Sequence, residues 1–193
     1  MENPRLTFAT PTIIAGDRSL VSLIAHELAH SWSGNLVTNA TWNDFWLNEG
    51  FTVYFERRIM EALYGKDYTD MLALLGFQDL TSELSSLDED MQKLKLKLNG
   101  LHPDDAMSDI AYEKGYFFLR MLEEKKGRAK MDSFLKNYFD DHKFQTITTE
   151  EFLAYLDQNL LQGEEDGLMI NQWVYQSGLP ANCPKVLSNR FVQ

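Results

Sequence analysis

The protein has 193 residues, of which 44% are hydrophobic and 12% aromatic, and its formal net charge is −11. This composition supports a buried core and argues against a disordered chain. The acidic balance argues against binding to nucleic acid or to an anionic membrane surface, and no apolar run approaches the roughly 20 residues that span a bilayer. Cys183 is the only cysteine and the first ten residues do not resemble a secretory signal, so we expect no disulfide and a cytoplasmic location.

Hydrophobic spacing along the chain predicts a mainly α fold with little β structure. Apolar residues recur at helical spacing in seven segments: 20–32, 45–63, 68–80, 111–125, 130–141, 149–160 and 168–176. A polar stretch over 82–92 is also expected to be helical, and Thr148 to Glu151 has the pattern of a capping box. Residues 93–98 alternate lysine and leucine, which predicts one short strand. No repeat or linker divides the chain, so we expect one domain over residues 1–193.

The most specific motif is His26-Glu27-Leu28-Ala29-His30. Residues four apart lie on one face of a helix, so both imidazoles can reach a single metal ion. Zinc accepts two such nitrogens and leaves positions for a third ligand and a water. Glu27 lies one residue round from this face, where it can act as a general base on that water. A lone histidine would more often be a core or surface residue, but two of the four histidines in the chain occupy this motif.

Glu49 is the third zinc ligand in this interpretation. The segment between His30 and Glu49 has 18 residues, which suits a turn and an antiparallel return of a second helix. Two histidines and a carboxylate with one open position are typical of hydrolytic rather than structural zinc. The alternative is that Glu49 is a solvated helix residue. We therefore predict a zinc hydrolase that holds one Zn²⁺ through His26, His30 and Glu49.

With these motifs the chain resembles peptidase family M1, the gluzincin zinc aminopeptidases, and within it the subgroup of leukotriene A4 hydrolase and aminopeptidase B. The resemblance covers essentially the whole chain. It rests on the H-E-x-x-H motif with a glutamate after 18 further residues, and on the segments MENPRLTFATPT, GDRSL, AYEKG, TITTEEF and SGLP. It implies the helical lobe of a thermolysin-like catalytic domain, and an activity that releases N-terminal amino acids from peptides.

The resemblance also implies further site residues. Glu2 matches the glutamate of the family's G-x-M-E-N motif, which binds the free α-amino group of the substrate, and Tyr112 in AYEKG matches a tyrosine that stabilises the oxyanion. Asp104 matches an acid that contacts a basic first side chain in some members. Glu56 is expected to support a zinc histidine from the second helix. From the residues alone, Tyr112 would be interpreted as a core aromatic and Glu2 as a frayed terminal acid.

The sequence departs from the family pattern at two places. It begins at Met1, inside the G-x-M-E-N motif. We therefore expect part of a catalytic domain that lacks the family's N-terminal β-domain, the rest of the catalytic domain and the C-terminal helical domain. Met107 stands where leukotriene A4 hydrolase has a tyrosine, which argues against epoxide hydrolysis, although a bifunctional epoxide hydrolase-like parent stays an alternative.

Three hypotheses for the activity follow. An aminopeptidase would act as a monomer on peptides with a free N-terminus, without nucleic-acid or membrane partners. An endopeptidase would use the same zinc chemistry, but the segment Met1-Glu2-Asn3 argues against it. The third hypothesis is an isolated fragment that binds zinc and serves as a folding or interaction module with little activity.

Overall fold

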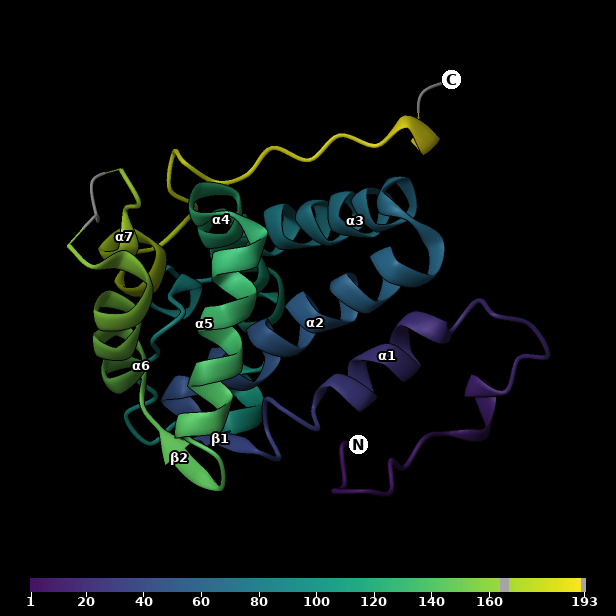
Figure 1. Ribbon diagram of the computed structural model, residues 1–193, viewed down its shortest axis with the longest axis horizontal. Coiled ribbons are helices and arrows are strands. Elements are labelled where there is room, and N and C mark those ends of the chain that lie inside the picture. The colour runs from purple at the N-terminus through teal and green to yellow at the C-terminus, as the bar shows by residue number, and fades with distance from the viewer. Residues whose placement is uncertain (164–166, 192–193) are drawn as a thin grey trace.

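A computed structural model describes residues 1–163 and 167–191 of the chain, and it confirms the mainly α class. In Figure 1, α2 crosses the middle of the molecule, with α1 and the N-terminal segment on one side of it and the later helices on the other. The helices are α1 (Val21–Ala29), α2 (Trp46–Tyr64), α3 (Lys66–Leu84), α4 (Gly115–Lys126), α5 (Arg128–Asp141), α6 (Thr149–Leu156) and α7 (Ile170–Tyr175). Over these described ranges, every helix is too short or too polar to cross a membrane.

Helix α2 is the centre of the fold because it is enclosed on all sides. All residues from Trp46 to Tyr54 are buried, including the polar ones. A helix without a polar face has to be surrounded by other elements, and α2 packs against α1, α3, α4 and a π-helix over Ile110–Lys114. Its second half, after Tyr54, approaches the surface: Arg57 and Met60 are buried, most other positions are half-buried, and residues 62–64 are exposed. The first half of α2 therefore fixes where the neighbouring helices lie.

Two glycines bring α2 and α4 into backbone contact. A Cβ atom added to Gly50 would lie 2.8 Å from Gly115 Cα and 3.1 Å from the Ala111 carbonyl oxygen, so neither glycine has room for a side chain. The predicted helix over 111–125 begins at this crossing as the π-helix Ile110–Lys114 rather than as a regular α-helix. A π-turn accommodates an extra residue, and this one presents Tyr112 beside the start of α2.

An aromatic core joins α2 to α4, α5 and α6. The Trp46 ring makes edge contacts with the rings of Phe118 and Phe152, at centroid distances of 5.7 and 5.6 Å. Phe51 stacks on Tyr138 at 5.5 Å. Aromatic pairs in such geometries add stability beyond the area they bury. These rings hold the C-terminal helices against the first half of α2.

Helix α6 begins at the predicted capping box, which the structure confirms through reciprocal bonds between Thr148 and Glu151. The buried carboxylate of Asp44 adds a second anchor, because its Oδ1 accepts hydrogen bonds from the Thr149 amide and hydroxyl, both at 2.8 Å. Burial would raise the pKa of Asp44, but bonds from Lys95, Thr41 and Thr149 outweigh it and keep the pKa below its ordinary value. The turn before α2 is thereby tied to the start of α6.

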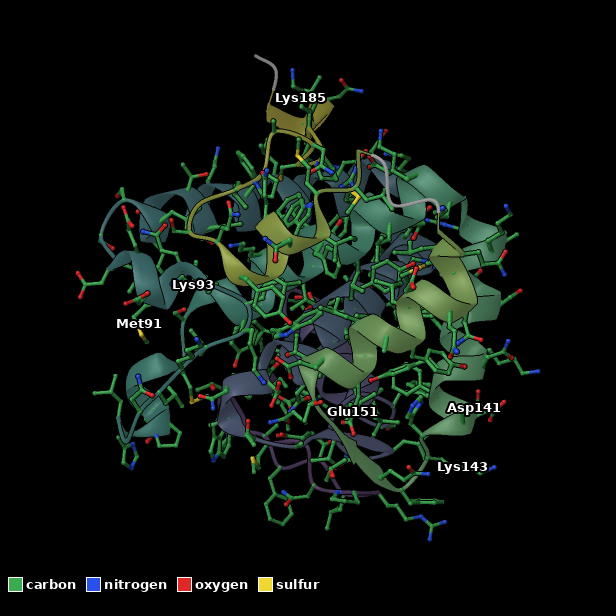
Figure 2. The ribbon with its side chains drawn as sticks, turned by 90° about the vertical axis from the view of Figure 1, so that its left-hand side faces the viewer. Met91, Lys93, Asp141, Lys143, Glu151 and Lys185 are labelled. Carbon is green, nitrogen blue, oxygen red and sulfur yellow. The ribbon has the colours of Figure 1, made fainter. Side chains whose placement is uncertain are left out.

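The predicted strand over 93–98 is wrong. The leucines of this segment are buried, so its alternation does report one-sided burial. The backbone, however, runs irregularly, and the amides of Lys95 and Leu96 donate to the carbonyls of Val174 and Asn43, both at 3.0 Å. Those acceptors belong to α7 and to a 3-10 turn, so no ladder forms. In Figure 2, Lys93 lies toward one side of the molecule, near Met91.

The prediction of a helix over 82–92 holds only up to Leu84, where α3 ends. A turn and a 3-10 helix over Glu89–Gln92 follow. The β structure forms elsewhere, between β1 (Val37–Asn39) and β2 (Gln145–Ile147), which pair in parallel. Three-residue strands are too short to carry a period-two signal, which is why hydrophobic spacing did not indicate them.

Lys114 is a fully buried cation at the end of the π-helix. Its ammonium group donates to the Gln92 carbonyl at 2.7 Å and to the Gln176 carbonyl at 2.8 Å. Burial is the larger effect on this group and lowers the pKa of Lys114 to about 7, against a smaller opposing effect of the Cys183 thiol. The side chain joins the π-helix to the 3-10 helix Glu89–Gln92 and to Gln176, the residue directly after α7.

We expect Lys114 to make stability depend on pH. Its folded pKa of about 7 lies below its ordinary value of 10.5, so between these values the folded chain binds fewer protons than the unfolded one. The contribution of Lys114 to the free energy of unfolding therefore rises with pH across this window and is lost as the pH falls to about 7. Urea denaturation should show the advantage of wild type over Lys114→Met growing by roughly 1–4 kcal/mol from about pH 7 to about pH 10.

The control for this experiment is Lys97→Met, at an exposed lysine, which should keep the wild-type slope. A Lys114→Met variant with the wild-type slope would show that Lys114 is not the group responsible.

The glycine crossing gives a second prediction. Gly115→Ala places a methyl group against Gly50 Cα at 2.8 Å, and the two helices can accept it only by moving apart. We expect a loss of about 1–3 kcal/mol in the free energy of unfolding, measured by urea denaturation. Lys125→Ala, at an exposed position of the same helix, should change it by less than about 0.5 kcal/mol. Equal effects of the two substitutions would contradict the tight crossing.

Candidate metal centre

Helix α1 presents the two histidines of the H-E-x-x-H motif one turn apart. The rings of His26 and His30 lie edge to face, with their centroids 4.8 Å apart. Both are turned toward α2, and His30 is buried. The chain continues to turn after α1 ends, because the His30 amide still donates to the His26 carbonyl at 3.2 Å. The helical spacing of the motif therefore places both imidazoles on the inner face of α1.

Glu49 reaches the same point from the first turn of α2. Its Oε2 lies 3.2 Å from His26 Nε2 and 3.6 Å from His30 Nε2. Ligand atoms that surround a tetrahedral zinc ion at 2.0–2.1 Å lie roughly 3.3 Å from one another, so these separations suit the ion. Glu49 Oε2 is buried and has no hydrogen-bond partner among the described residues. An unpaired buried carboxylate oxygen is costly, and a cation at this point removes the cost.

The charges around His26 also favour a cation. Glu56 makes the contact expected of it, with Oε2 3.1 Å from His26 Nδ1. Burial opposes a positive charge on His26, but the Glu49 and Glu56 carboxylates next to its two ring nitrogens outweigh it and raise the pKa of His26 to about 9. The cluster thus holds either a proton on the imidazole or a metal ion, and a metal ion has to displace that proton.

The carboxylates of Glu27 and Glu2 lie beside this cluster. One oxygen of each and a ring nitrogen of His30 lie within 4.8 Å of one another. The Oε2 atom of Glu27 is buried, and the ammonium nitrogen of Met1 lies 3.0 Å from it at an angle that makes no hydrogen bond. Asn35 fixes the position of Glu2 by donating from Nδ2 to the Glu2 carbonyl at 2.7 Å. Two further carboxylates therefore lie next to the candidate ligands but do not belong to the group of His26, His30 and Glu49.

Tyr112 lies beside the ring of His26. Its ring is nearly parallel to the His26 ring at a centroid distance of 6.2 Å, and it makes an edge contact with Phe45 at 6.1 Å. Burial, followed by the charge of the Glu49 carboxylate, raises the pKa of Tyr112. The phenol therefore stays neutral at physiological pH and can donate a hydrogen bond.

Asp104 is exposed, unlike the residues of the buried cluster. It belongs to the 3-10 turn Pro103–Ala106, its side chain is 77% exposed, and its Oδ2 is 3.6 Å from His102 Nδ1. Nothing in these contacts tests a role in substrate binding, which stays a prediction.

A cleft of about 380 Å³ opens next to the metal cluster. It begins at Glu2 and follows the turn after α1 and strand β1 as far as the start of α2. Its walls combine backbone, amide and hydroxyl groups with two aromatic rings, which suits a peptide-like ligand. The lining residues are Glu2, Gly34, Asn35, Thr38, Asn39, Ala40, Thr41, Trp42, Phe45 and Asn48.

Two residues that contact His30 through its Nδ1 atom were not predicted from the sequence. Asn48 and Thr52 are four residues apart on α2, and both have an oxygen within 3.1 Å of His30 Nδ1. That spacing could have indicated a common face, but only the fold shows that this face is turned toward His30.

Comparison with known proteins places these features in a family. The family model of the peptidase family M1 domain matches residues 1–173. Leucine aminopeptidase 2 of Neosartorya fischeri is 46% identical over 187 residues, which cover 93% of this chain and 30% of that protein. A leukotriene A-4 hydrolase homolog of Botryotinia fuckeliana is 45% identical over 188 residues, which cover 94% of this chain and 29% of that protein.

Solved structures agree with the sequence comparison. Yeast LTA4 hydrolase in complex with bestatin superposes with a TM-score of 0.90 at 43% identity, over 97% of this chain and 31% of that one. A mutant M1 zinc metallopeptidase from Deinococcus radiodurans, bound to a Tyr-Ser-Ala substrate, has a TM-score of 0.74 at 27% identity, over 95% of this chain and 38% of that one. The chain spans about 30% of the length of the curated relatives it matches. The sequence match, the shared fold and the His-His-Glu cluster together show that the chain belongs to peptidase family M1.

Proposed function

We propose that this chain is the helical part of the catalytic domain of a zinc aminopeptidase, which releases N-terminal amino acids from peptides. The observation that carries the proposal is the convergence of His26 Nε2, His30 Nε2 and Glu49 Oε2, with the carboxylates of Glu2 and Glu27 beside them. Several relatives are named leucine aminopeptidase 2, which supports the reaction class. The greater length of the relatives supports a parent protein with further domains, of which residues 1–193 are one part.

In this proposal His26, His30 and Glu49 hold the zinc ion. A bound zinc ion lowers the pKa of a water and polarises the carbonyl of the peptide bond. Glu27 accepts a proton from the attacking water and returns it to the leaving amine. The position of its carboxylate supports this role, because one oxygen is buried and lies beside the cluster.

Tyr112 and Glu2 act on the substrate itself. The neutral phenol of Tyr112 donates a hydrogen bond to the oxyanion that develops on the carbonyl carbon. The Glu2 carboxylate pairs with the substrate's ammonium group, and this limits cleavage to one residue from the N-terminus. Asp104 would favour a basic first residue, whereas relatives of the chain are named leucine aminopeptidases, so the first-residue preference is best measured with both substrates.

We also propose a cytoplasmic location, which the single cysteine favours, and a monomeric state. Epoxide hydrolysis is not included, because Met107 has no hydroxyl group to take part in it. An endopeptidase is disfavoured by Glu2, since a carboxylate beside the metal cluster selects a free ammonium group.

The aminopeptidase proposal predicts a strict need for a free N-terminus. The zinc-loaded protein should hydrolyse leucine or arginine p-nitroanilide and should not hydrolyse the N-acetylated forms, because acetylation removes the ammonium group that Glu2 binds. Release of nitroaniline, followed by absorbance, measures both. Glu2→Gln should lower kcat/KM on the free substrates by about 10–100-fold, through loss of a charged hydrogen bond. Equal cleavage of free and acetylated substrates would identify an endopeptidase instead.

The base assignment predicts that metal binding and turnover separate at Glu27. Glu27→Gln should keep one zinc per chain, measured by atomic absorption, and lose at least about 100-fold in kcat, because the amide cannot accept the proton. His26→Ala should lose both zinc and activity. A Glu27→Gln protein that loses its zinc would instead mean that Glu27 is a ligand.

A further inference from the structure

We propose that Asn48 is a positioning residue for His30 and that it reaches His30 through a gap left open by Gly34. In this role Asn48 holds the imidazole with its Nε2 lone pair toward the metal cluster and so increases zinc affinity. The inference rests on the proposed function, since it assigns His30 Nε2 to the metal.

The Nδ1 atom of His30 is surrounded by oxygen atoms. Asn48 Oδ1 lies at 2.9 Å, the Ser33 carbonyl oxygen at 3.0 Å and Thr52 Oγ1 at 3.1 Å, and all these residues are buried. A carbonyl oxygen only accepts hydrogen bonds, so the ring nitrogen that faces Ser33 carries the hydrogen. Asn48 therefore turns its oxygen, and not its amide nitrogen, toward the same N–H group. A neutral imidazole then has its lone pair on Nε2, on the side of Glu49.

Neighbouring hydrogen bonds fix the hydroxyl group of Thr52. Thr52 Oγ1 donates to the Asn48 carbonyl at 2.9 Å, and Ser33 Oγ lies 2.7 Å from Thr52 Oγ1. Because the Thr52 hydrogen is used within α2, its oxygen lone pair is left for His30. Helix α2 thus contributes Glu49 toward the metal side of His30, and Asn48 and Thr52 toward the opposite side.

Gly34 is required for the approach of Asn48. A Cβ atom at position 34 would lie 2.8 Å from Asn48 Oδ1 and 3.3 Å from His30 Nδ1, and Gly34 has a φ of +109°. Both the contact and the backbone conformation exclude a side chain here. The turn that follows α1 therefore leaves the space through which the Asn48 amide meets the imidazole.

The two histidines are held by different chemistry. Glu56 supplies a negative charge to His26, whereas the acceptors at His30 are neutral. What matters at His30 is the position of the acceptor oxygen and not its charge. An acceptor oxygen of the same shape should therefore replace Asn48, and a hydrocarbon of the same size should not.

The test compares Asn48→Leu with Asn48→Asp. Zinc dissociation constants are measured by competition with a chromogenic chelator, and urea denaturation shows that each variant is folded. Removal of a hydrogen-bond partner of a metal ligand lowers metal affinity by about 10–100-fold, which is the expected effect of Asn48→Leu. Asn48→Asp should stay within about threefold of wild type. An Asn48→Leu protein with wild-type affinity, or an Asn48→Asp protein as weak as Asn48→Leu, would overturn the proposal.

Nitrogen-15 NMR of the metal-free protein provides a readout that does not involve activity. His30 should show its hydrogen on Nδ1 in wild type and in Asn48→Asp, and a mixture of both tautomers in Asn48→Leu. A wild-type His30 protonated on Nε2 alone would contradict the assignment.

Gly34→Ala tests the gap, with Gly16→Ala as its matched control. Gly16 also has a positive φ, of +82°, but a Cβ there would meet nothing within 4 Å, so this control carries the backbone strain without the contact. Gly34→Ala should lower zinc affinity as Asn48→Leu does, and Gly16→Ala should leave it unchanged. The double variant Gly34→Ala/Asn48→Leu should bind zinc no more weakly than the weaker single variant, because both changes remove one contact. Additive losses would contradict that shared cause.

These outcomes are separate from those of the aminopeptidase test. Wild-type protein that binds zinc but hydrolyses no anilide would overturn the proposed function, while the zinc affinities of the variants still decide the role of Asn48. Wild-type protein that binds no zinc would overturn both.

Discussion

The antiparallel packing of α1 on α2 is the constraint on which the rest of the site depends. Both histidines contact Glu49 near the beginning of α2. His30 also contacts Asn48 and Thr52, whereas His26 also contacts Glu56, further along the helix. From His26 to His30 along α1, the contacts therefore move back toward the beginning of α2. Each histidine meets α2 with both ring nitrogens, and a shift of either helix by one turn would separate all of these contacts together.

The same segment of α2 is also fixed from its other side. Gly50 directly follows Glu49 and touches Gly115 through backbone atoms, which holds the π-helix and Tyr112 at the cluster. The position of the tyrosine relative to the carboxylate is thus set by a contact that contains no side chains. Lys114 adds a polar tie from the π-helix to two carbonyl groups in distant segments. The site is built where three separately anchored elements meet.

Much of this arrangement could be predicted from local sequence, because its determinants are local. The apolar spacing of α2 and α5 extends over several turns, and the two histidines are four residues apart on one helix. The capping box at Thr148 is similarly a short pattern with a physical mechanism. The family resemblance added Glu2 and Tyr112, which have no local signal of their own.

The rest depends on contacts between distant segments, and the sequence contains no direct record of them. Val37 pairs with Gln145 in strands of three residues, and the need for Gly34 follows from where Asn48 lies. The segment 93–98 shows the opposite failure, since its leucines are buried on one side while its amides bond to a helix and a turn. Period-two burial and a β-ladder are separate properties, and only the first is visible in a sequence.

The enclosure of α2 has a consequence for how this protein can vary. From Trp46 to Tyr54 every position is buried, so a substitution there disturbs the candidate metal ligands, the aromatic core or the glycine crossing. The walls of the adjacent cleft, from Asn35 to Trp42, are instead formed by the turn after α1, strand β1 and the segment that follows it. Exposed residues of this wall, such as Ala40 and Trp42, can change size and polarity without disturbing the buried cluster. We therefore expect differences in size and polarity to gather in this loop, while the first half of α2 keeps its residues.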